Sequence, residues 1–373
     1  MVYQPKFYYR VEVLATDTNN NPTEFVVLLS DYQYPGFSLH PLFNVNDKPD
    51  YVLLSAFEGS IYHTGTSTYD ETDSSAMDTN NDMLSSIAGV KPTSGANKNF
   101  NCANAEKLAA NRGAGWHITS MEVESAQQML MAVEFGTLNI QAATGMKGIV
   151  DLTRVNNVNT ASLTGSTVTG GTGNAVSTIN EVSGTYTSYT ENGKVACCYR
   201  YVENPWGNLW RFVNGTTVVY NPETASSYGE YQQNNNQYTL GRQTGWSTNT
   251  AYKYRIPSTE NYITKFFYKS GEFLPCEATQ DGNSALPVGD FLWSQPGIIS
   301  SVNTSNSVLI GGTSYHGDKA GPFSIATDKV HSIASAAIGA RIIHVPAKTD
   351  TSYSTNLEKI AEEFTPTQNS DYK

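Results

Sequence analysis

The chain has 373 residues and a formal net charge of −11 at pH 7, with 15% charged and 11% aromatic residues. This length and aromatic content exclude wholesale disorder and allow two or more domains. The sequence has no Lys/Arg cluster that would bind phosphate groups, and no run of the ~18 to 20 apolar residues that a spanning helix needs, so we expect neither nucleic-acid binding nor membrane insertion.

Residues 1–100 are predicted to form a β-rich region for attachment or assembly. Two β-rich runs, Lys6–Asp17 and Thr23–Asp31, flank the turn signal "TNNNP" and predict a hairpin. The stretch "DYVLLSAFEGS" (Asp50–Ser60) predicts a buried strand. The first residues lack the basic and then apolar layout of a signal peptide, so we expect assembly without export.

Residues 66–100 are mostly polar and predict a long connection anchored by Met83, Leu84 and Ile87. Within it, "DTNND" (Asp78–Asp82) places oxygen ligands at alternate positions. It lacks the glycine and the distal glutamate that complete an EF-hand loop. We therefore predict a polar turn here, and no calcium site.

Two consecutive helices are predicted next. The shorter one covers "CANAEKLAANRG" (Cys102–Gly113) and is closed by its last glycine. The second begins at a capping box with S/T-x-x-E spacing, Thr119–Glu122, and ends at Gly136 as its C-cap. Its predicted buried face contains four apolar residues at helical spacing: Ala126, Met129, Leu130 and Val133.

A β-rich half follows the helices. Residues 159–192 consist mainly of Thr, Ser, Gly and Asn, which leaves two interpretations, an insertion or an exposed hairpin. Strands are predicted in three stretches: residues 194–222, residues 251–278 and "IGARIIHVP" (Ile338–Pro346), the last core strand. Residues 347–373 are predicted to be a polar tail with a small helix around Asn356–Phe364.

The residues that carry chemistry form no catalytic motif. There is no nucleophile elbow, H-E-x-x-H motif, P-loop or dinucleotide fingerprint. The four cysteines have neither metal-ligand spacing nor a disulfide framework, and we expect them to be reduced and largely buried: Cys102, Cys197, Cys198 and Cys276. Five carboxylates of the β-rich half are expected in solvated loops: Glu203, Glu230, Asp281, Asp290 and Asp318. We predict no catalytic residue, no metal and no cofactor.

Two stretches, Ser226–Trp246 and Asp290–Ser307, set Tyr and Trp among Ser, Asn, Gln and Gly. This composition is typical of adaptable recognition surfaces, because Tyr and Trp give large contact areas at low entropic cost. The alternative is that the aromatic residues fill a β core, which is the better interpretation for Trp206 and Trp210. Both interpretations remain open for five others: Tyr228, Tyr231, Trp293, Tyr315 and His316.

The order of four stretches carries a family resemblance: "GWHITSMEVESAQQMLMAVEFGTLNIQ", "ENPWGNLWRFVNG", "GGTSYHGDKAGPFSI" and "IGARIIHVP". The chain resembles the C-type lectin-like proteins of phages and gut bacteria that diversity-generating retroelements vary, in the formylglycine-generating-enzyme-like subclass. Upstream, "PGFSLHPLF", "AFEGS" and "LSSIAGVKPTSG" look like phage minor structural proteins. The implied fold is α+β: a lectin-like domain over residues 101–346, with two helices, small antiparallel sheets and long loops, after the β-rich N-terminal region.

The resemblance also implies residue roles. The implied structural frame contains Trp116, Trp206, Gly207, Asn208, Trp210, Gly311, Gly312, Gly321, Phe323, Gly339 and Arg341. The implied ligand-binding surface contains Trp293, Ser294, Gln295, Ser314, Tyr315, His316, Asp318 and Lys319. In this interpretation the glycines hold the backbone, and the side chains between them are the ones that vary.

Two sequence motifs of related proteins are missing from this chain, which limits the functions that the resemblance implies. The calcium and sugar tripeptides of animal lectins are absent, since "QPG" (Gln295–Gly297) has no carboxylate in its third place. The paired catalytic cysteines of the formylglycine-generating enzyme are not recognisable either. The resemblance therefore implies the fold without the oxidase, and without a calcium-dependent sugar site.

The expected function is that of a phage virion protein of the tail-fibre type that binds a host cell-surface protein or glycan and catalyses nothing. Its other expected partners are virion proteins and further copies of itself, a homo-oligomer that analogy makes a trimer. One alternative is a structural virion protein for capsid decoration or tail assembly. The other is a glycan depolymerase that uses two of the five carboxylates.

Overall fold

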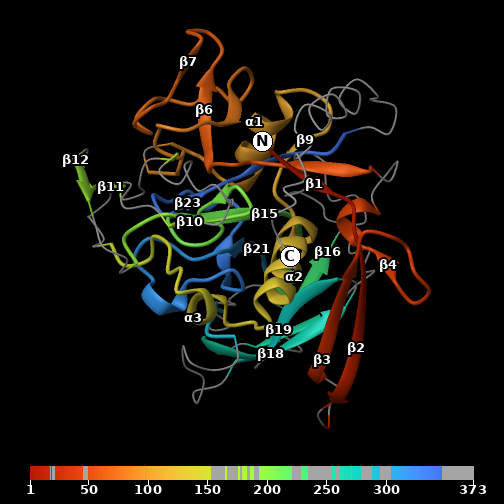
Figure 1. Cartoon of the computed structure of the whole chain (residues 1–373). Coiled ribbons are helices and arrows are strands. Elements are labelled where there is room, and N and C mark those ends of the chain that lie inside the picture. Colours follow the sequence, from red (N-terminus) through yellow and green to blue (C-terminus); the bar gives the residue numbers. More distant parts are fainter. Residues whose placement is uncertain are drawn as a thin grey trace, which may run out of the picture.

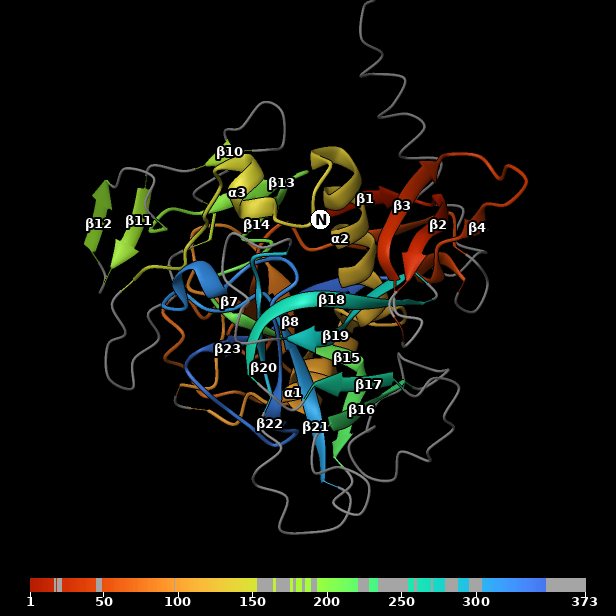
Figure 2. The same cartoon turned by 90° about the horizontal axis from the view of Figure 1, so that it is seen from below.

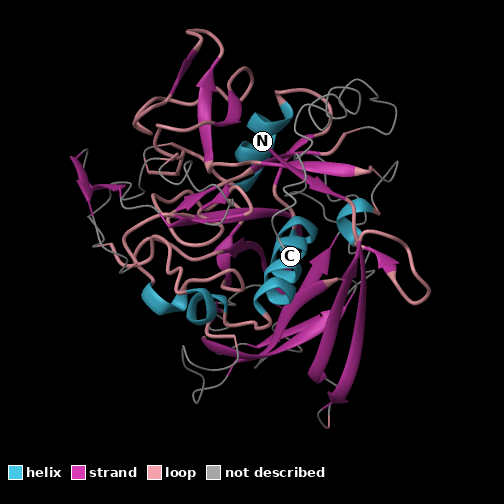
Figure 3. Cartoon of the chain, viewed as in Figure 1, coloured by secondary structure: helices cyan, strands magenta, loops and turns pink. Residues whose placement is uncertain are grey.

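Strands dominate the described part of the chain, and few helices accompany them (Figure 3). The computed structural model describes residues 1–16, 18, 22–44, 49–96, 98–152, 164–165, 175–176, 179–182, 185–188, 193–220, 228–233, 254–257, 260–269, 271–278, 288–294 and 304–346. The predicted α+β class is confirmed. Among the described helices, none combines the length and apolar character that crossing a membrane requires.

The predicted N-terminal hairpin is present. Strands β2 (Tyr8–Thr16) and β3 (Pro22–Ser30) pair antiparallel and project at the lower right of Figure 1, while β4 (Ser38–Leu39) pairs with β2. Burial alternates along β3, and the inward residues Phe25 and Val27 pack against the main hydrophobic cluster. The 3₁₀ helix η1 (Pro41–Phe43) follows the hairpin region.

One four-stranded antiparallel sheet joins the two ends of the described chain. Its order is β1 (Val2–Pro5), β5 (Tyr51–Leu54), β24 (Ile342–His344) and β9 (Trp116–Ile118). The sheet combines strands from both sides of the boundary predicted at residue 100, and its central strand β5 is buried along its whole length. Along this sheet, the N-terminal strands and the last core strand form one structural unit.

Among the described residues of the long connection predicted at 66–100, two short strands pair with β6 (Gly59–His63), and the rest is irregular. Strand β6 pairs with β7 (Thr68–Tyr69) and with β8 (Met83–Ser86), at the upper left of Figure 1. Leu84 is fully buried, as predicted for an anchor, and the two strands were missed because they are only two and four residues long. The polar turn at Asp78–Asp82 is confirmed: the Asn80 amide donates to Asp78 Oδ1 at 2.9 Å, and the Asp82 amide donates to the Asp78 carbonyl at 2.8 Å.

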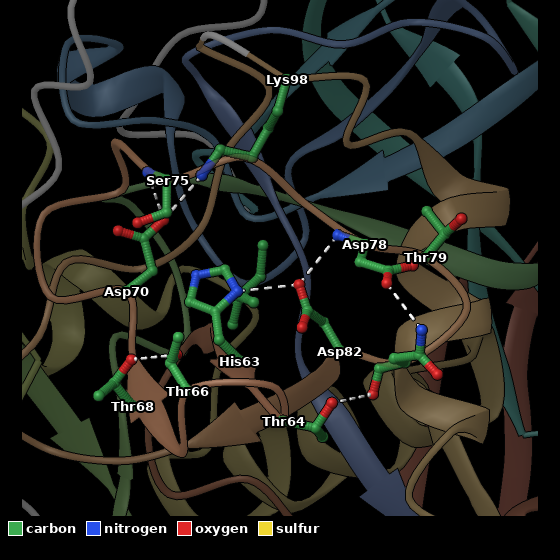
Figure 4. Close-up of polar contacts among 12 residues, drawn as sticks. His63, Thr64, Thr66, Thr68, Asp70, Ser75, Asp78, Thr79, Asp82 and Lys98 are labelled. Carbon is green, nitrogen blue, oxygen red and sulfur yellow. Dashed lines mark hydrogen bonds and ion pairs between the residues drawn. The ribbon is translucent and has the colours of Figure 1, made fainter.

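A buried ion-pair cluster holds this region together (Figure 4). Lys98 Nζ lies 2.9 Å from an oxygen of Asp70 and 2.9 Å from an oxygen of Asp73, and the three side chains are 3%, 1% and 0% exposed. The Ser94 amide and hydroxyl both donate to Asp73 Oδ2, at 3.1 and 2.6 Å. Nearby, His63 Nδ1 and the Asp78 amide both contact Asp82 Oδ2 at 2.9 Å. Side chains from distant parts of the segment thus fix a stretch that has little regular structure.

The two predicted helices are α1 (Cys102–Ala110) and α2 (Met121–Phe135), and a third, α3 (Ile140–Thr144), follows. Gly136 ends α2 in the left-handed region, as predicted, with φ at 66°. The predicted capping box is wrong: Ser120 is the N-cap, and the Thr119 hydroxyl donates instead to Glu124 Oε1 at 2.7 Å. The helix is anchored at its start by tertiary contacts of Glu124 and not by a local cap.

Helix α2 lies at the centre of the molecule (Figure 1), against η1 and strands β3, β15 and β19. Ala126 and Met129 of the predicted face are fully buried, and Leu130 packs against the main cluster. Val133 is 39% exposed, so its predicted burial is wrong. Elements on several sides of the helix bury most of its first nine residues, which a single apolar stripe cannot indicate.

The largest sheet has nine strands and lies behind α2; Figure 2 shows several of them. Its order is β17 (Tyr254–Pro257), β16 (Tyr228–Gln233), β15 (Trp210–Tyr220), β21 (Thr304–Ile310), β22 (Ile325–Val330), β20 (Phe291–Trp293), β18 (Asn261–Lys269) and β19 (Glu272–Ala278), with β23 (Ile338–Gly339) beside β15. The strands predicted in residues 194–222 and 251–278 are therefore present.

A three-stranded sheet and a hairpin complete the described strands. The sheet contains β10 (Ala175–Val176), β13 (Cys197–Tyr199) and β14 (Val202–Glu203). Within the predicted 159–192 segment, β11 (Ile179–Val182) and β12 (Thr185–Ser188) form an antiparallel hairpin. Cys197 and Cys198 are buried, and Cys102 and Cys276 are half-buried. The predicted tail, residues 347–373, lies outside the described residues.

Candidate binding surface

Three of the residues predicted to contact a ligand come together in one aromatic cluster. Trp293, at the end of β20, stacks on His316 with ring centroids 4.6 Å apart and an interplanar angle of 25°. Tyr315 lies edge-on to His316 at 5.0 Å, and Trp210 lies edge-on beneath Trp293 at 5.1 Å. Trp293, Tyr315 and His316 are half-buried, whereas Trp210 is only 6% exposed and forms the floor. Such aromatic contacts stabilise a cluster beyond the area that they bury.

Charged side chains lie around this cluster. Lys319 Nζ lies 4.3 Å from the ring centroid of Phe291, whose ring is 4.7 Å from that of Trp293. The sequence analysis missed Phe291, although it stands two residues before Trp293 on the same strand and therefore shares its face. Asp318 is 58% exposed and 3.6 Å from Lys147 Nζ, an exposed pair of little energetic weight.

The loop that carries Tyr315 and His316 is held by its backbone. Gly311 and Gly312 have φ angles of 102° and 79°, a region that favours glycine. The Gly311 amide donates to the Ser324 carbonyl at 3.0 Å, and the Gly311 carbonyl accepts from the Gly207 amide at 2.9 Å. A Cβ at Gly311 would lie 2.7 Å from the Arg211 guanidinium. Residues 311–324, which we name the frame loop, are therefore held mainly by backbone contacts, and the Thr313 amide also donates to His316 Nδ1 at 3.3 Å.

Asp290 closes the frame loop from inside the protein. Its side chain is buried, its Oδ2 accepts the Phe323 amide at 2.7 Å, and burial raises its pKa well above the usual range. The expectation that Asp290 and Glu203 are solvated is wrong, because both are 1% exposed. Asp318 is exposed as expected. The side chains of Glu230 and Asp281 lie outside the description.

The close contact between Asp290 and Gly321 gives a first prediction. A Cβ at Gly321 would overlap the Asp290 carboxylate. Gly321→Ala is therefore expected to lower the free energy of unfolding by about 2 to 3 kcal/mol, as measured by urea denaturation. Gly65→Ala is the matched control, because Gly65 has open space around its Cβ position and no positive φ, so its effect should stay within about 0.5 kcal/mol. Equal effects of the two substitutions would contradict this role of Gly321.

Two predicted contact residues are placed elsewhere. Ser294 and Ser314 are 2% and 1% exposed, so the expectation that they lie on the binding surface is corrected: they lie beneath it. The Ser314 amide donates to the Asn208 carbonyl at 2.9 Å, and the Ser314 carbonyl accepts from the Leu152 amide at 2.6 Å. Gln295 lies outside the described residues.

The residues assigned to the structural frame lie mostly in the interior. Trp206 is fully buried and donates from Nε1 to the Lys147 carbonyl at 2.9 Å. A Cβ at Gly207, where φ is 75°, would overlap the Ile149 carbonyl oxygen. Trp116 is half-buried, with the Arg112 guanidinium 4.4 Å above its ring. The other frame residues are also buried: Asn208, Phe323, Gly339 and Arg341.

A buried carboxylate that the sequence analysis missed organises this frame. Glu58 is 6% exposed and accepts hydrogen bonds from the Nδ2 groups of Asn204 and Asn208, two residues with positive φ. Burial raises the pKa of Glu58, and the Arg341 guanidinium opposes that rise. Arg341 donates in turn to the carbonyls of Glu203 and Asn204. The stretch "AFEGS" contains the residue, but nothing in its local pattern indicates a buried charge.

Among the described residues, one serine and histidine pair has the spacing of a nucleophile and its base, but its surroundings do not suit catalysis. Ser307 Oγ lies 2.8 Å from His331 Nδ1, but Ser307 is 1% exposed and Thr217 Oγ1 occupies the other ring nitrogen at 3.0 Å. A substrate has no access to this hydroxyl in the folded protein. Within the described ranges, no group of three His, Cys, Asp or Glu residues could hold a metal ion. No protein-family model and no curated protein matches the sequence.

Proposed function

We propose that this chain is a phage virion protein of the receptor-binding, tail-fibre type, with a C-type lectin-like fold, that binds a host surface protein or glycan. One observation carries the proposal. Two chain segments, the end of β20 and the frame loop, bring Trp293, Tyr315, His316 and Lys319 together over a buried aromatic floor. The backbone beneath them is held mainly by backbone hydrogen bonds and buried contacts, to which the His316 side chain adds one bond by accepting the Thr313 amide at 3.3 Å.

This arrangement suits recognition and not catalysis. Half-buried aromatic rings lose little conformational freedom on binding, and neighbouring charged side chains add specificity at the rim. Side chains on a rigid backbone can be exchanged without loss of the fold, which is what a varied receptor-binding surface requires. Many copies on one particle would convert weak single contacts into strong attachment, and a homotrimeric fibre would provide such copies.

A binding assay with host cells and a glycan array tests this function. We expect Tyr315→Ala and Lys319→Ala each to weaken binding about tenfold, since central aromatic and charged contacts contribute most of an interface's affinity. Tyr32→Ala is the matched control, because Tyr32 is 72% exposed and lies outside the frame loop. Binding that Tyr315→Ala and Lys319→Ala leave unchanged, or that Tyr32→Ala weakens as much, would contradict the proposal.

One observation favours the alternative of a structural virion protein. The β2–β3 hairpin exposes four apolar side chains: Val26 at 38% and Leu28 at 39% on the outward face of β3, and Val13 at 48% and Leu14 at 57% toward the end of β2. Exposed apolar side chains on one element can mark an assembly contact. Hydrogen exchange on intact particles separates the two functions. Protection of the frame loop would favour the structural role, whereas protection of β2–β3 alone would leave the frame loop available to a receptor.

A further inference from the structure

A buried lysine contacts two buried carboxyl groups in the segment between β7 and α1 (Figure 4). Lys98 Nζ lies 2.9 Å from Asp70 Oδ2 and 2.9 Å from Asp73 Oδ1, and the three side chains are 3%, 1% and 0% exposed. Besides being an ion pair, this cluster holds an amine against a carboxyl group, away from water. Neither the end of β20 nor the frame loop contributes to it, so the inference drawn from it goes beyond the proposed function and does not rest on it.

The two carboxyl groups differ in their affinity for a proton. Burial raises the pKa of Asp73, and the charge of Lys98 opposes that rise. Burial acts on Asp70 in the same direction, but hydrogen bonds from Lys98 and from two backbone amides outweigh it and lower the pKa of Asp70 below its usual value. When the pKa values of two neighbouring groups are pushed apart, one group is suited to hold a proton and the other to accept one.

The surroundings of Asp73 are arranged around its carboxyl group. Its φ angle is 57°, in the left-handed region that residues other than glycine rarely adopt, and such backbone strain concentrates at functional sites. The Ser94 amide and hydroxyl both donate to Asp73 Oδ2, at 3.1 and 2.6 Å. The Ala96 amide in turn donates to Ser94 Oγ at 3.2 Å. Two donors on one carboxyl oxygen are the arrangement that stabilises the oxyanion of an acyl-transfer intermediate.

Backbone hydrogen bonds hold the amine and the carboxyl groups in place. The Lys91 amide donates to the Glu71 carbonyl at 2.9 Å, which ties the two parts of the segment together. The Gly95 amide donates to the Ser335 carbonyl at 2.9 Å, which fixes the part that carries the amine. Groups held in contact in this way react with effective molarities of about 10⁵ to 10⁸ M. Burial also favours the neutral amine and the neutral acid over their ions, and these neutral forms are the ones that react.

We propose that Lys98 and Asp73 condense to an amide, which links their side chains covalently. Asp73 enters the reaction protonated on Oδ1, and Asp70 takes a proton from the Lys98 ammonium group to leave a neutral amine. Nζ attacks Asp73 Cγ, and the Ser94 amide and hydroxyl stabilise the charge that develops on Oδ2. Asp70 then gives its proton to Oδ1, the bond from Cγ to Oδ1 breaks, and Asp70 takes the second proton from Nζ. The products are the amide, one water molecule and a protonated Asp70, without any oxidant or reductant.

The link closes residues 73–98 into a covalent loop. A closed loop restricts the unfolded chain in the same way as a disulfide does, so the amide stabilises the folded protein. Removal of Lys98 should therefore destabilise a linked protein at least as much as the loss of the ion pair alone would.

Mass spectrometry of the unfolded full chain tests the link. We expect an intact mass that is lower than the mass of the sequence by one water molecule. Met77 and Met83 lie between Asp73 and Lys98, so cyanogen bromide cuts the chain twice between the linked residues. The fragment that ends at Met77 and the fragment that begins at Leu84 should stay joined, and their fragmentation should place the link on Asp73.

Two lysine variants provide the controls. Lys98→Arg keeps the positive charge, but a guanidinium does not lose its proton and cannot attack, so this variant should have the full mass of its sequence. Cooperative unfolding of Lys98→Arg in urea shows that the missing link is not a failure to fold. Lys6→Met changes the exposed pair of Lys6 and Asp50, and should leave the mass deficit of one water molecule unchanged.

The roles of Asp70 and Ser94 are tested by the rate at which the link appears after cell-free synthesis of the chain. Asp70→Ala removes the base and should slow the reaction at least about 100-fold. Ser94→Ala keeps the backbone donor and removes the hydroxyl, so it should slow the reaction at least about tenfold. Equal rates in the parent and both variants would overturn this mechanism, and a link on Asp70 would overturn the roles of the two carboxyl groups. An intact mass equal to that of the sequence, with separate cyanogen bromide fragments, would overturn the proposal and leave an ordinary buried ion pair.

Discussion

Lys98→Met is expected to lower the free energy of unfolding by about 3 to 5 kcal/mol, as measured by urea denaturation. The substitution leaves Asp70 and Asp73 without the cation that lies 2.9 Å from both, and the two carboxyl side chains are 1% and 0% exposed. Burial already raises the pKa of Asp73, and Lys98 opposes that rise. Without Lys98 the pKa of Asp73 should rise further, so the loss of stability should shrink as the pH falls.

Lys6→Met is the matched control for Lys98→Met. Lys6 pairs with Asp50 in the same way, but the two side chains are 40% and 73% exposed, so we expect a loss below about 1 kcal/mol. Adding Asp70→Asn and Asp73→Asn to Lys98→Met should recover part of the stability, because no buried charge is then left uncompensated. A loss for Lys98→Met no larger than that for Lys6→Met would show that the cluster is hydrated or neutral in solution.

Local features of the fold could be predicted from the sequence, because their determinants lie within a few residues of each other. The hairpin β2–β3 follows from alternation around an Asn-rich turn, and α1 and α2 follow from helical periodicity with closing glycines. The capping box failed although its spacing was right. Glu124, with a buried Arg211 as its partner, decides how α2 begins, and that partner is far away in the chain.

Long-range pairing could not be predicted in this way. The sheet β1–β5–β24–β9 assembles strands from three distant parts of the chain, and no local pattern specifies which strands are neighbours. The strands β7 and β8 are too short to show a strand pattern in the sequence, and they are strands because β6 pairs with both of them. Strand propensity depends on such context more than helix propensity does.

The candidate site shows the same division. The order of motifs pointed to Trp293, Tyr315 and His316, and these three rings are in contact. The burial of Ser294, Ser314 and Asp290 was not foreseen, because a small polar residue is buried only when tertiary contacts satisfy its hydrogen bonds.

His40 is expected to make the protein sensitive to acid. It is fully buried, and burial lowers its pKa from 6.5 to about 3. Between pH 6.5 and about 3, His40 is protonated in the unfolded chain but neutral in the folded protein. Stability that is fully present above pH 6.5 is therefore lost as the pH falls toward 3, by about 1.4 kcal/mol per pH unit. His331, whose pKa burial lowers to about 4, should act in the same direction.

His40→Asn isolates the contribution of His40. His40 Nδ1 accepts the Leu42 amide at 3.2 Å at the start of η1, and an asparagine Oδ1 can accept the same bond. We expect the variant to be less stable than the parent at pH 7.5, where the lost ring contacts with Phe7 and Tyr9 dominate. Between pH 7.5 and pH 4.5, the free energy of unfolding of the variant relative to that of the parent should rise by about 3 kcal/mol, as measured by urea denaturation at each pH.

Other buried groups have the opposite dependence of stability on pH, and comparing His40→Asn with the parent cancels their contribution. Burial raises the pKa values of Glu58, Glu106 and Asp290, so these carboxyls favour the folded state as the pH falls, but they do so equally in parent and variant. Leu42→Ala, at a neighbouring buried residue, should lower stability by the same amount at every pH. The stability difference between His40→Asn and the parent should therefore change with pH, whereas that between Leu42→Ala and the parent should not. If neither changes with pH, His40 is hydrated enough in solution to titrate normally.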